Sequence, residues 1–257
     1  MKLQLLSDLH LETEAFMPQP ASGAELLVLA GDIDATWAGL SHFAGWPVPV
    51  IFVAGNHEFD GRDFDLASAA LRARCQTLGL TMLERESLVL RAQSGELIRF
   101  LGTTRWSDFD TFGAERRPQA QRAASYFVRI MQASRHGQPF DAQAVRDEAL
   151  LCRAWLAQAL AEPARGRWQR TVAITHFAPS LRSADPRFGA QPGTASFCNN
   201  DDALLPYATL WLHGHLHCRH DYTVAHGGGA TRVVCAARGL ASKGESQGHD
   251  PLLLLDA

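Results

Sequence analysis

Metal-ligating side chains occur in five short clusters along this chain, and nearly every cluster directly follows a run of residues that predicts a β-strand. The clusters lie far apart and together span most of the 257 residues. Their side chains can therefore meet only in a fold that brings the ends of several strands to one edge. In chain order the clusters contain Asp8 and His10, Asp32, Asn56, His176, and finally His215 with His217.

The predicted strands are short apolar runs that end at a polar residue or at glycine, as expected for buried strands. They are residues 3–6, 26–30, 50–54, 171–175, 209–212 and 252–255, together with the hairpins 88–92/97–102 and 222–225/232–236. Helical spacing of apolar residues predicts helices over 36–44 and 62–78, and Gly79 stands where helix C-caps prefer glycine. This alternation of strands and helices indicates a sheet covered by helices.

The middle of the chain, residues 115–160, is rich in alanine, glutamine and arginine. It is predicted to be mainly helical, with a break near Gly137 and Pro139. The sequence contains no internal repeat and no linker-like segment. We therefore expect one domain over residues 1–257, in which the helical segment 115–160 is an insertion that covers the sheet.

The charge and cysteine content exclude several classes of protein. A formal net charge of −3 and the lack of a Lys/Arg block argue against a surface that grips a long nucleic acid, and favour a small substrate. The five cysteines form no CxxC pair, which predicts a reducing compartment. The N-terminus lacks the apolar core of a signal peptide, and no apolar run approaches the ~18 residues that span a bilayer. We expect a soluble cytoplasmic protein.

The residue types in the clusters suit divalent transition metals. Asp8 and His10 are two residues apart on an extended segment, so their side chains point the same way and can bind one ion together. Histidine and aspartate with one asparagine amide are ligands typical of Mn, Fe or Zn. Asp32 stands alone in its cluster and is the natural candidate to bridge two cations. Each cluster alone is a weak signal, since Gly-Asp is more often a turn. Together they indicate a two-metal hydrolytic centre.

The clusters and their neighbours also form blocks that resemble those of the calcineurin-like metallophosphoesterase superfamily, in the same order. These blocks cover residues 8–217 and are Asp8-Leu9-His10, Gly31-Asp32, Gly55-Asn56-His57-Glu58, His176 and Gly214-His215-Leu216-His217. The chain is most similar to small bacterial phosphoesterases of this superfamily. The resemblance implies an α/β fold, a four-layer α/β/β/α sandwich with two mixed β-sheets and a binuclear metal site at the carboxyl-terminal edge of the strands.

The resemblance also implies a role for each site residue. The first cation would be held by Asp8, His10, Asp32 and His217, and the second by Asp32, Asn56, His176 and His215. His57 would bind no metal and would face the substrate. The two divalent cations would be Mn, Fe, Zn or Ni. The residue that orients His57 stays open among Asp34, Glu58 and Asp60.

These assignments predict a binuclear-metal-dependent phosphoric ester hydrolase. A hydroxide that bridges the two metals would attack phosphorus, and His57 would assist the departing alkoxide. Phosphodiesters and phosphomonoesters of small or nucleotide substrates both fit this chemistry. One alternative is a nuclease, which the acidic balance and the missing basic groove disfavour. The other is a non-catalytic metal-binding scaffold, which the complete ligand set disfavours. The native metal, the substrate and the oligomeric state stay open.

Substrate recognition is expected in the long irregular loop of residues 177–202, which several prolines and glycines keep from regular structure. Three arginines are candidates to pair with a phosphate group through two hydrogen bonds: Arg105, Arg182 and Arg187. Trp106 and Phe197 are candidates for stacking on a base, although buried aromatic residues are commoner. His213, which precedes the last cluster, is expected to be structural.

Overall fold

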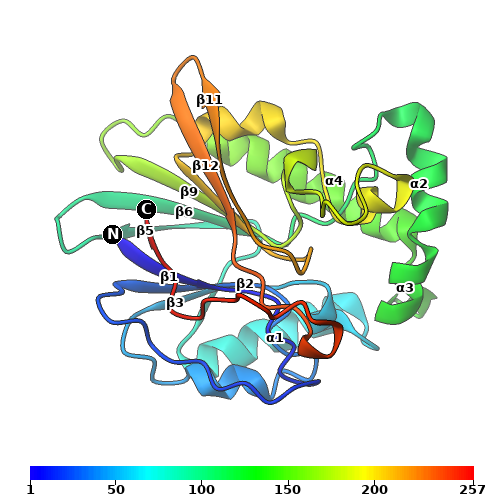
Figure 1. The fold of residues 1–257 in the computed structure, drawn as a ribbon, viewed down its shortest axis with the longest axis horizontal. Helices are drawn as coiled ribbons and strands as arrows, with labels where there is room; N and C mark the ends of the chain where they lie inside the picture. The colour runs from blue at the N-terminus through cyan, green and yellow to red at the C-terminus, as the bar shows by residue number, and fades with distance from the viewer.

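Two β-sheets packed face to face form the centre of the structure, a computed structural model that describes residues 1–257 (Figure 1). The strand order is β13-β1-β2-β3-β4 in the first sheet and β11-β12-β10-β9-β6-β5 in the second. The first sheet contains β1 (Lys2–Leu6), β2 (Leu26–Ala30), β3 (Val50–Val53), β4 (Thr81–Met82) and β13 (Leu254–Asp256). The second contains β5 (Glu86–Arg91), β6 (Leu97–Thr103), β9 (Arg170–Thr175), β10 (Leu210–His213), β11 (His220–His226) and β12 (Gly229–Cys235).

Both sheets are mixed. Strands β1 to β4 run parallel to one another, and β13 is antiparallel to β1. In the second sheet β6, β9, β10 and β12 are parallel, while β5 and β11 pair with their neighbours as antiparallel hairpins. Neighbouring parallel strands end at the same edge of a sheet. The residues that follow β1, β2 and β3 therefore lie together, as do those that follow β9 and β10.

The strands are apolar throughout because both of their faces are buried. In β2, Leu26 and Val28 belong to the core between the two sheets, whereas Leu27 and Leu29 belong to the core on the outer side. All five residues of β2 are buried, so the strand shows no alternation of polar and apolar residues. The second sheet contributes side chains such as Phe100 to the shared core.

One helix covers the outer face of each sheet. Helix α1 (Phe64–Leu78) lies on the first sheet, where Leu71 belongs to the same apolar cluster as Leu29. Helix α4 (Ala142–Ala161) lies on the second sheet through residues such as Leu156. The four layers are visible from bottom to top in Figure 1. The predicted α/β/β/α sandwich is therefore confirmed.

One predicted helix is wrong in type and extent. Residues 36–44 form only a short 3-10 turn, η1 (Gly39–Phe43). The side chain of Asp34 accepts hydrogen bonds from the backbone N–H groups of Thr36 (2.6 Å) and Gly39 (2.7 Å). These bonds hold the backbone in a tight turn and compete with the start of an α-helix.

The segment predicted as a helical insertion has two parts. It contains α2 (Arg117–Ala123), α3 (Ser125–Met131), a hairpin of β7 (Ser134–Arg135) and β8 (Gln138–Pro139), and then α4. The expected break near Gly137 is this hairpin. Only α4 lies on the sheet, whereas α2 and α3 stand beside the sandwich, at the right of Figure 1. Helix α2 contacts the 3-10 turn η5 (Pro192–Ser196) of the long loop.

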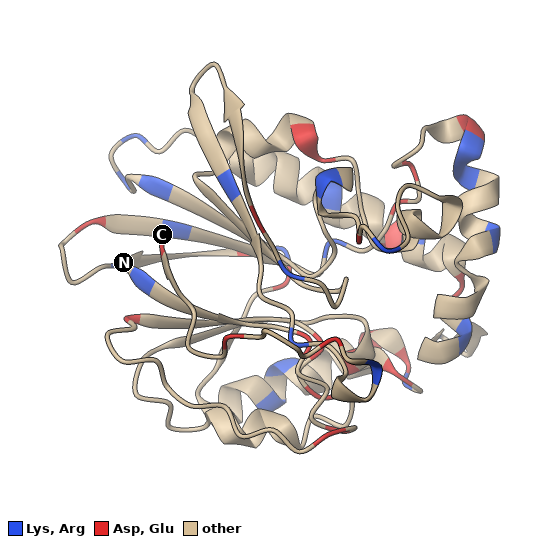
Figure 2. Cartoon of the chain, in the orientation of Figure 1, with Lys and Arg blue, Asp and Glu red and all other residues tan.

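Charged residues are spread over the whole fold. Figure 2 shows lysine and arginine on strands of both sheets and on the helices. Many are paired with nearby carboxylates, as Arg232 is with Asp221 and Arg170 with Glu96. No helix in the structure combines the length and the apolarity that crossing a bilayer requires.

Candidate metal centre

The ends of five strands bring the ligand clusters together. Three overlapping groups of side chains have their ligand atoms within 4.8 Å of one another: Asp8, His10 and His217; His10, Asp32 and His57; and Asp32, His176 and His215. All of these residues are buried except His57 and His217, which are partly exposed. Asp32 belongs to two of the groups, as a residue that bridges two cations must. The convergence expected from the sequence is present.

In the first group, two histidines point the same type of nitrogen at each other. The Nε2 atoms of His10 and His217 are 3.0 Å apart, and His217 Nε2 lies 3.7 Å from Asp8 Oδ1. His10 donates its Nδ1–H to Glu12 (3.0 Å), and His217 donates its Nδ1–H to Glu245 (2.7 Å). These bonds orient the two rings and direct each Nε2 at the other. Two ring nitrogens that point at each other beside the carboxylate of Asp8 suit a shared cation.

In the second group, backbone carbonyls orient the histidines. His176 donates Nδ1–H to the carbonyl of Ala30 (2.8 Å), so its Nε2 is directed at Asp32 Oδ2, 3.1 Å away. His215 donates Nε2–H to the carbonyl of Ser196 (3.0 Å), which leaves its Nδ1 as the available nitrogen. The second group thus offers one nitrogen from each ring beside the shared carboxylate.

Four buried polar atoms of the residues predicted as ligands form no hydrogen bond, although Asp32 Oδ2 and His176 Nε2 face each other at 3.1 Å. They are Asp8 Oδ2, Asp32 Oδ2, Asn56 Oδ1 and His176 Nε2. A buried carboxylate oxygen or amide oxygen without a partner is costly, because it loses its water without replacement. All four belong to residues predicted as ligands, and all can donate an electron pair. The donor set therefore fits two divalent cations.

The charges around the site favour positive charge within it. Burial alone would lower the pKa of the His57 imidazole, but Asp32 and Asp60 outweigh burial and raise it to about 10. Asp32 likewise overcomes the burial of His176 and raises the pKa of that ring to about 9. A field that stabilises protonated imidazoles will also stabilise bound metal cations.

A similar architecture occurs in a solved structure. A phosphopantetheinyl hydrolase from Mycobacterium tuberculosis superposes with a TM-score of 0.71, covering 98% of this chain and 94% of that chain at 18% sequence identity. This chain has the calcineurin-like metallophosphoesterase fold. A dimetal phosphatase from Danio rerio gives a TM-score of 0.47, covering 91% of this chain and 86% of that chain at 12% identity. The sequence matches no protein-family profile and no curated protein.

In this metallophosphoesterase fold, His57 is held at the border of the two ligand groups. Its backbone N–H donates to Asp32 Oδ1 (2.9 Å), and its ring centroid is 5.1 Å from that of His10. The ring Nδ1–H donates to Asp60 Oδ2 at 2.6 Å. Of the three residues that the sequence left open, Asp60 is therefore the one that orients His57. The ring nitrogen Nε2 is left free to meet another molecule.

Glu58 and Asp34 accept hydrogen bonds from backbone N–H groups instead. The carboxylate of Glu58 accepts hydrogen bonds from the backbone N–H groups of Asp32 (3.0 Å), Ile33 (2.8 Å) and Gly55 (2.7 Å). Burial and the nearby Asp32 raise the pKa of Glu58 to about 7. Its bonds tie the loop after β2 to the loop after β3. Asp34 holds the turn that begins η1.

The backbone of the metal centre is unusual. Five of its residues have a positive φ angle: Asp8 (53°), His10 (48°), Asp32 (53°), His215 (74°) and His217 (52°). Such left-handed conformations are uncommon outside glycine, and strained residues concentrate at functional sites. Glycine is required beside them. A Cβ atom on Gly31 would collide with the ring of His176, and one on Gly55 would collide with the carboxylate of Asp32.

The prediction that Arg105 binds substrate is wrong. Its side chain is 0% exposed, and it donates to both carboxylate oxygens of Asp201 (2.8 and 2.9 Å) and to Asp108 (2.8 Å). These bonds attach the long loop to the end of β6 and leave Arg105 nothing to offer a ligand. Trp106 is likewise buried in the aromatic core, so it cannot stack on a base.

The two other arginines lie on the surface of the long loop. Arg182 is 3.6 Å from Asp202, and Arg187 forms a two-bonded pair with Asp185 (2.6 and 2.9 Å). Both remain accessible, and their role in substrate binding stays a prediction. His213 is fully buried and hydrogen-bonded, in agreement with the structural role expected for it.

The sequence analysis missed the two carboxylates behind the histidines of the first group. Glu12 lies two residues after His10, a spacing that could have revealed it. Glu245 lies in the C-terminal loop, 28 residues from His217, and nothing in its local sequence distinguishes it. Only the fold brings this second carboxylate to the site.

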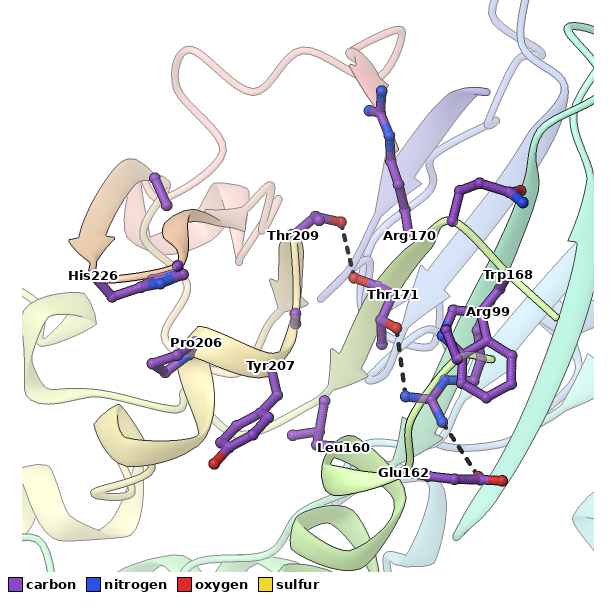
Figure 3. A pocket seen from close by; sticks show the side chains of 15 residues that line it. Arg99, Leu160, Glu162, Trp168, Arg170, Thr171, Pro206, Tyr207, Thr209 and His226 are labelled. Carbon is purple, nitrogen blue, oxygen red and sulfur yellow. Dashed lines mark hydrogen bonds and ion pairs between the residues drawn. The ribbon is translucent and has the colours of Figure 1, made fainter. Parts of the chain in front are cut away.

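A separate pocket of about 290 Å³ lies at the opposite end of the strands of the second sheet (Figure 3). Its lining includes Arg99 and Arg170, near the starts of β6 and β9. The guanidinium of Arg99 stacks on Trp168, 4.0 Å from the ring centroid, and donates to the carbonyl of Ala159 (2.9 Å). Because the ligand clusters follow the other ends of the strands, this pocket is not part of the metal centre.

Proposed function

We propose that this protein is a phosphoric ester hydrolase that works with two divalent cations. The observation that carries the proposal is the set of four buried, unpartnered donor atoms at the meeting point of five strand ends. Asp8, His10, Asp32 and His217 would hold the first cation, and Asp32, Asn56, His176 and His215 would hold the second. The metals proposed are Mn, Fe, Zn or Ni, the ions that such mixed nitrogen and oxygen ligands suit.

The residues of the site divide the chemistry between them. When bound, two divalent cations supply Lewis acidity toward the phosphoryl oxygens and lower the pKa of a coordinated water. Asp32 would hold both cations at a fixed separation. His57, oriented by Asp60, would direct its Nε2 at the leaving oxygen and donate a proton to it. General acid catalysis of this kind contributes roughly 10²–10⁴-fold to a rate.

A small phosphate ester is the proposed substrate. The similar structure is named as a phosphopantetheinyl hydrolase, and a formal net charge of −3 without a Lys/Arg block argues against a partner as highly charged as an extended nucleic acid. Arg182 and Arg187 are proposed to assist phosphate binding at the rim. All five cysteines are unpaired, which supports a cytoplasmic location. We propose that residues 1–257 act as one domain.

Removal of the metal is expected to abolish activity reversibly. Dialysis against a chelator should eliminate hydrolysis of bis(p-nitrophenyl) phosphate, because the ligand residues alone cannot stabilise charge on the phosphoryl oxygens. Adding back Mn, Fe, Zn or Ni in turn should restore turnover at about two equivalents per chain. The measurement is elemental analysis run in parallel with the hydrolysis assay. Two bound cations without turnover of any mono- or diester would favour a metal-binding scaffold instead.

The substitution Glu245→Gln is expected to weaken cation binding. The neutral amide oxygen of glutamine accepts the hydrogen bond from His217 Nδ1–H more weakly than a carboxylate does, so the ring becomes a weaker ligand. The loss of such a supporting partner typically costs ~10–100-fold in metal affinity. Competition with a fluorescent chelator measures the change. Glu115→Gln, which alters an exposed carboxylate outside the three candidate ligand groups, is the matched control. Equal affinities in the two variants would show that Glu245 does not support the ligand.

A further inference from the structure

The long loop forms an apolar pocket beside the candidate metal centre. The pocket has a volume of about 260 Å³, and its walls include Phe188, Phe197 and Leu216. Leu216 stands between the two ligand histidines of the last cluster. The ring of Phe197 packs on the ring of His215, with 4.9 Å between centroids. The pocket therefore borders the candidate metal centre.

Both aromatic side chains of the pocket are partly exposed to solvent. Phe188 is 63% exposed and Phe197 is 38% exposed. Exposed apolar side chains that lie together beside a polar centre indicate a binding surface, because leaving them in water forfeits the free energy of burial. Phe188 and Phe197 belong to the long loop, and together with Leu216 they form the apolar lining of the pocket.

Asp185, the charged side chain that lines the pocket, and the hydroxyl of Thr194 are both already bonded. The carboxylate of Asp185 is neutralised by the two-bonded pair with Arg187, whose guanidinium also lies 5.4 Å from the ring of Phe188. The hydroxyl of Thr194 donates to the carbonyl of Gly189 at 2.7 Å. No unpaired charge faces the pocket, so a charged group placed there would lose its water without compensation.

We infer that this pocket binds the uncharged, apolar organic group of the phosphate ester, an aryl or alkyl substituent. The inference rests on the proposed function, because the phosphate must be held at the metal centre for its substituent to reach Phe197 and Leu216. The volume is sufficient, since an apolar protein cavity of ~150 Å³ already binds benzene. The pocket would thus select substrates by the substituent and not by the phosphate.

The test uses three phosphonates whose C–P bond is not hydrolysed: methylphosphonate, phenylphosphonate and 2-aminoethylphosphonate. Binding to the metal-loaded protein is measured by titration calorimetry. Phenylphosphonate should bind at least about tenfold more tightly than methylphosphonate, the lower end of what a hydrophobic pocket gains from one methylene. The charged aminoethyl compound should gain nothing over the methyl compound.

Phe188→Ala should reduce the phenyl-to-methyl affinity ratio toward one, and Phe188→Leu should retain part of it. The exposed position of Phe188 means that neither change threatens the fold. Tyr207→Ala, which removes an exposed aromatic ring from the opposite end of the strands, is the matched control and should keep the ratio. Equal binding of the methyl and phenyl compounds by the unchanged protein overturns the pocket inference alone. Failure of all three compounds to bind overturns the metal-centre proposal.

Discussion

The variant Asp32→Asn is expected to lose at least one of its two cations and about 10³-fold in turnover. The carboxylate of Asp32 lies within 4.8 Å of the ligand atom of His10 on one side and of those of His176 and His215 on the other. A neutral amide cannot balance two divalent charges as a carboxylate does. Metal catalysis contributes several kcal/mol to stabilising the transition state, and each 1.36 kcal/mol is tenfold in rate. Elemental analysis and bis(p-nitrophenyl) phosphate hydrolysis measure the two losses.

The variant Asp32→Asn removes the negative charge and keeps a hydrogen-bond acceptor at the same position. Asparagine keeps an oxygen that can accept the backbone N–H of His57, as Asp32 Oδ1 does at 2.9 Å. Asp221→Asn is the matched control, because it removes an exposed carboxylate that pairs with Arg232 on β12. Full metal content together with undiminished turnover in Asp32→Asn would eliminate the bridging role.

The variant His57→Asn is expected to keep both cations and lose roughly 10²–10⁴-fold in turnover. The loss should be largest for esters with poor leaving groups, because an alkoxide needs a proton more than p-nitrophenolate does. The measurement compares kcat for an alkyl ester with kcat for a nitrophenyl ester, alongside the metal content.

Two further variants sharpen the interpretation. His42→Asn replaces an exposed histidine of η1 and is expected to behave as the unchanged protein. Asp60→Asn removes the carboxylate that orients His57 and should show a smaller loss with the same dependence on the leaving group. A loss that is equal for all leaving groups would mean that His57 positions the substrate and transfers no proton.

The strands could be predicted because burial on both faces leaves a signature in the sequence. The run over β2 is apolar at every position, and such runs end where the chain meets the metal edge. The end of α1 was equally readable, because Gly79 adopts the left-handed conformation (φ 75°) that a helix C-cap requires. Residues 36–44 also show helical spacing of apolar residues. There the side chain of Asp34 accepts hydrogen bonds from the backbone N–H groups of Thr36 and Gly39, which holds the segment in a turn.

Candidate site residues could be predicted where they stand in short motifs of the sequence. Their hydrogen-bond and ion-pair partners could not be predicted where these lie far away in the chain. Arg105 looked like a surface cation because Asp201, its partner, is 96 residues away. Asp60 and Glu58 were equivalent candidates in the sequence, since both lie close to His57. The 3-10 turn η2 (His57–Phe59) separates them by turning Glu58 into the protein. Long-range contacts of this kind leave no local pattern.

The left-handed backbone of the residues proposed as ligands bears on how a metal would enter the site. Hydrogen bonds such as Asp8 N–H to Gly31 O (3.0 Å) and His10 N–H to Asp32 O (3.2 Å) impose these conformations from within the chain. These bonds would hold the side chains proposed as ligands in position without an ion, unlike those of a zinc finger, which is unfolded until its ion arrives. Exchange of one bound cation for another would then require no refolding of the chain.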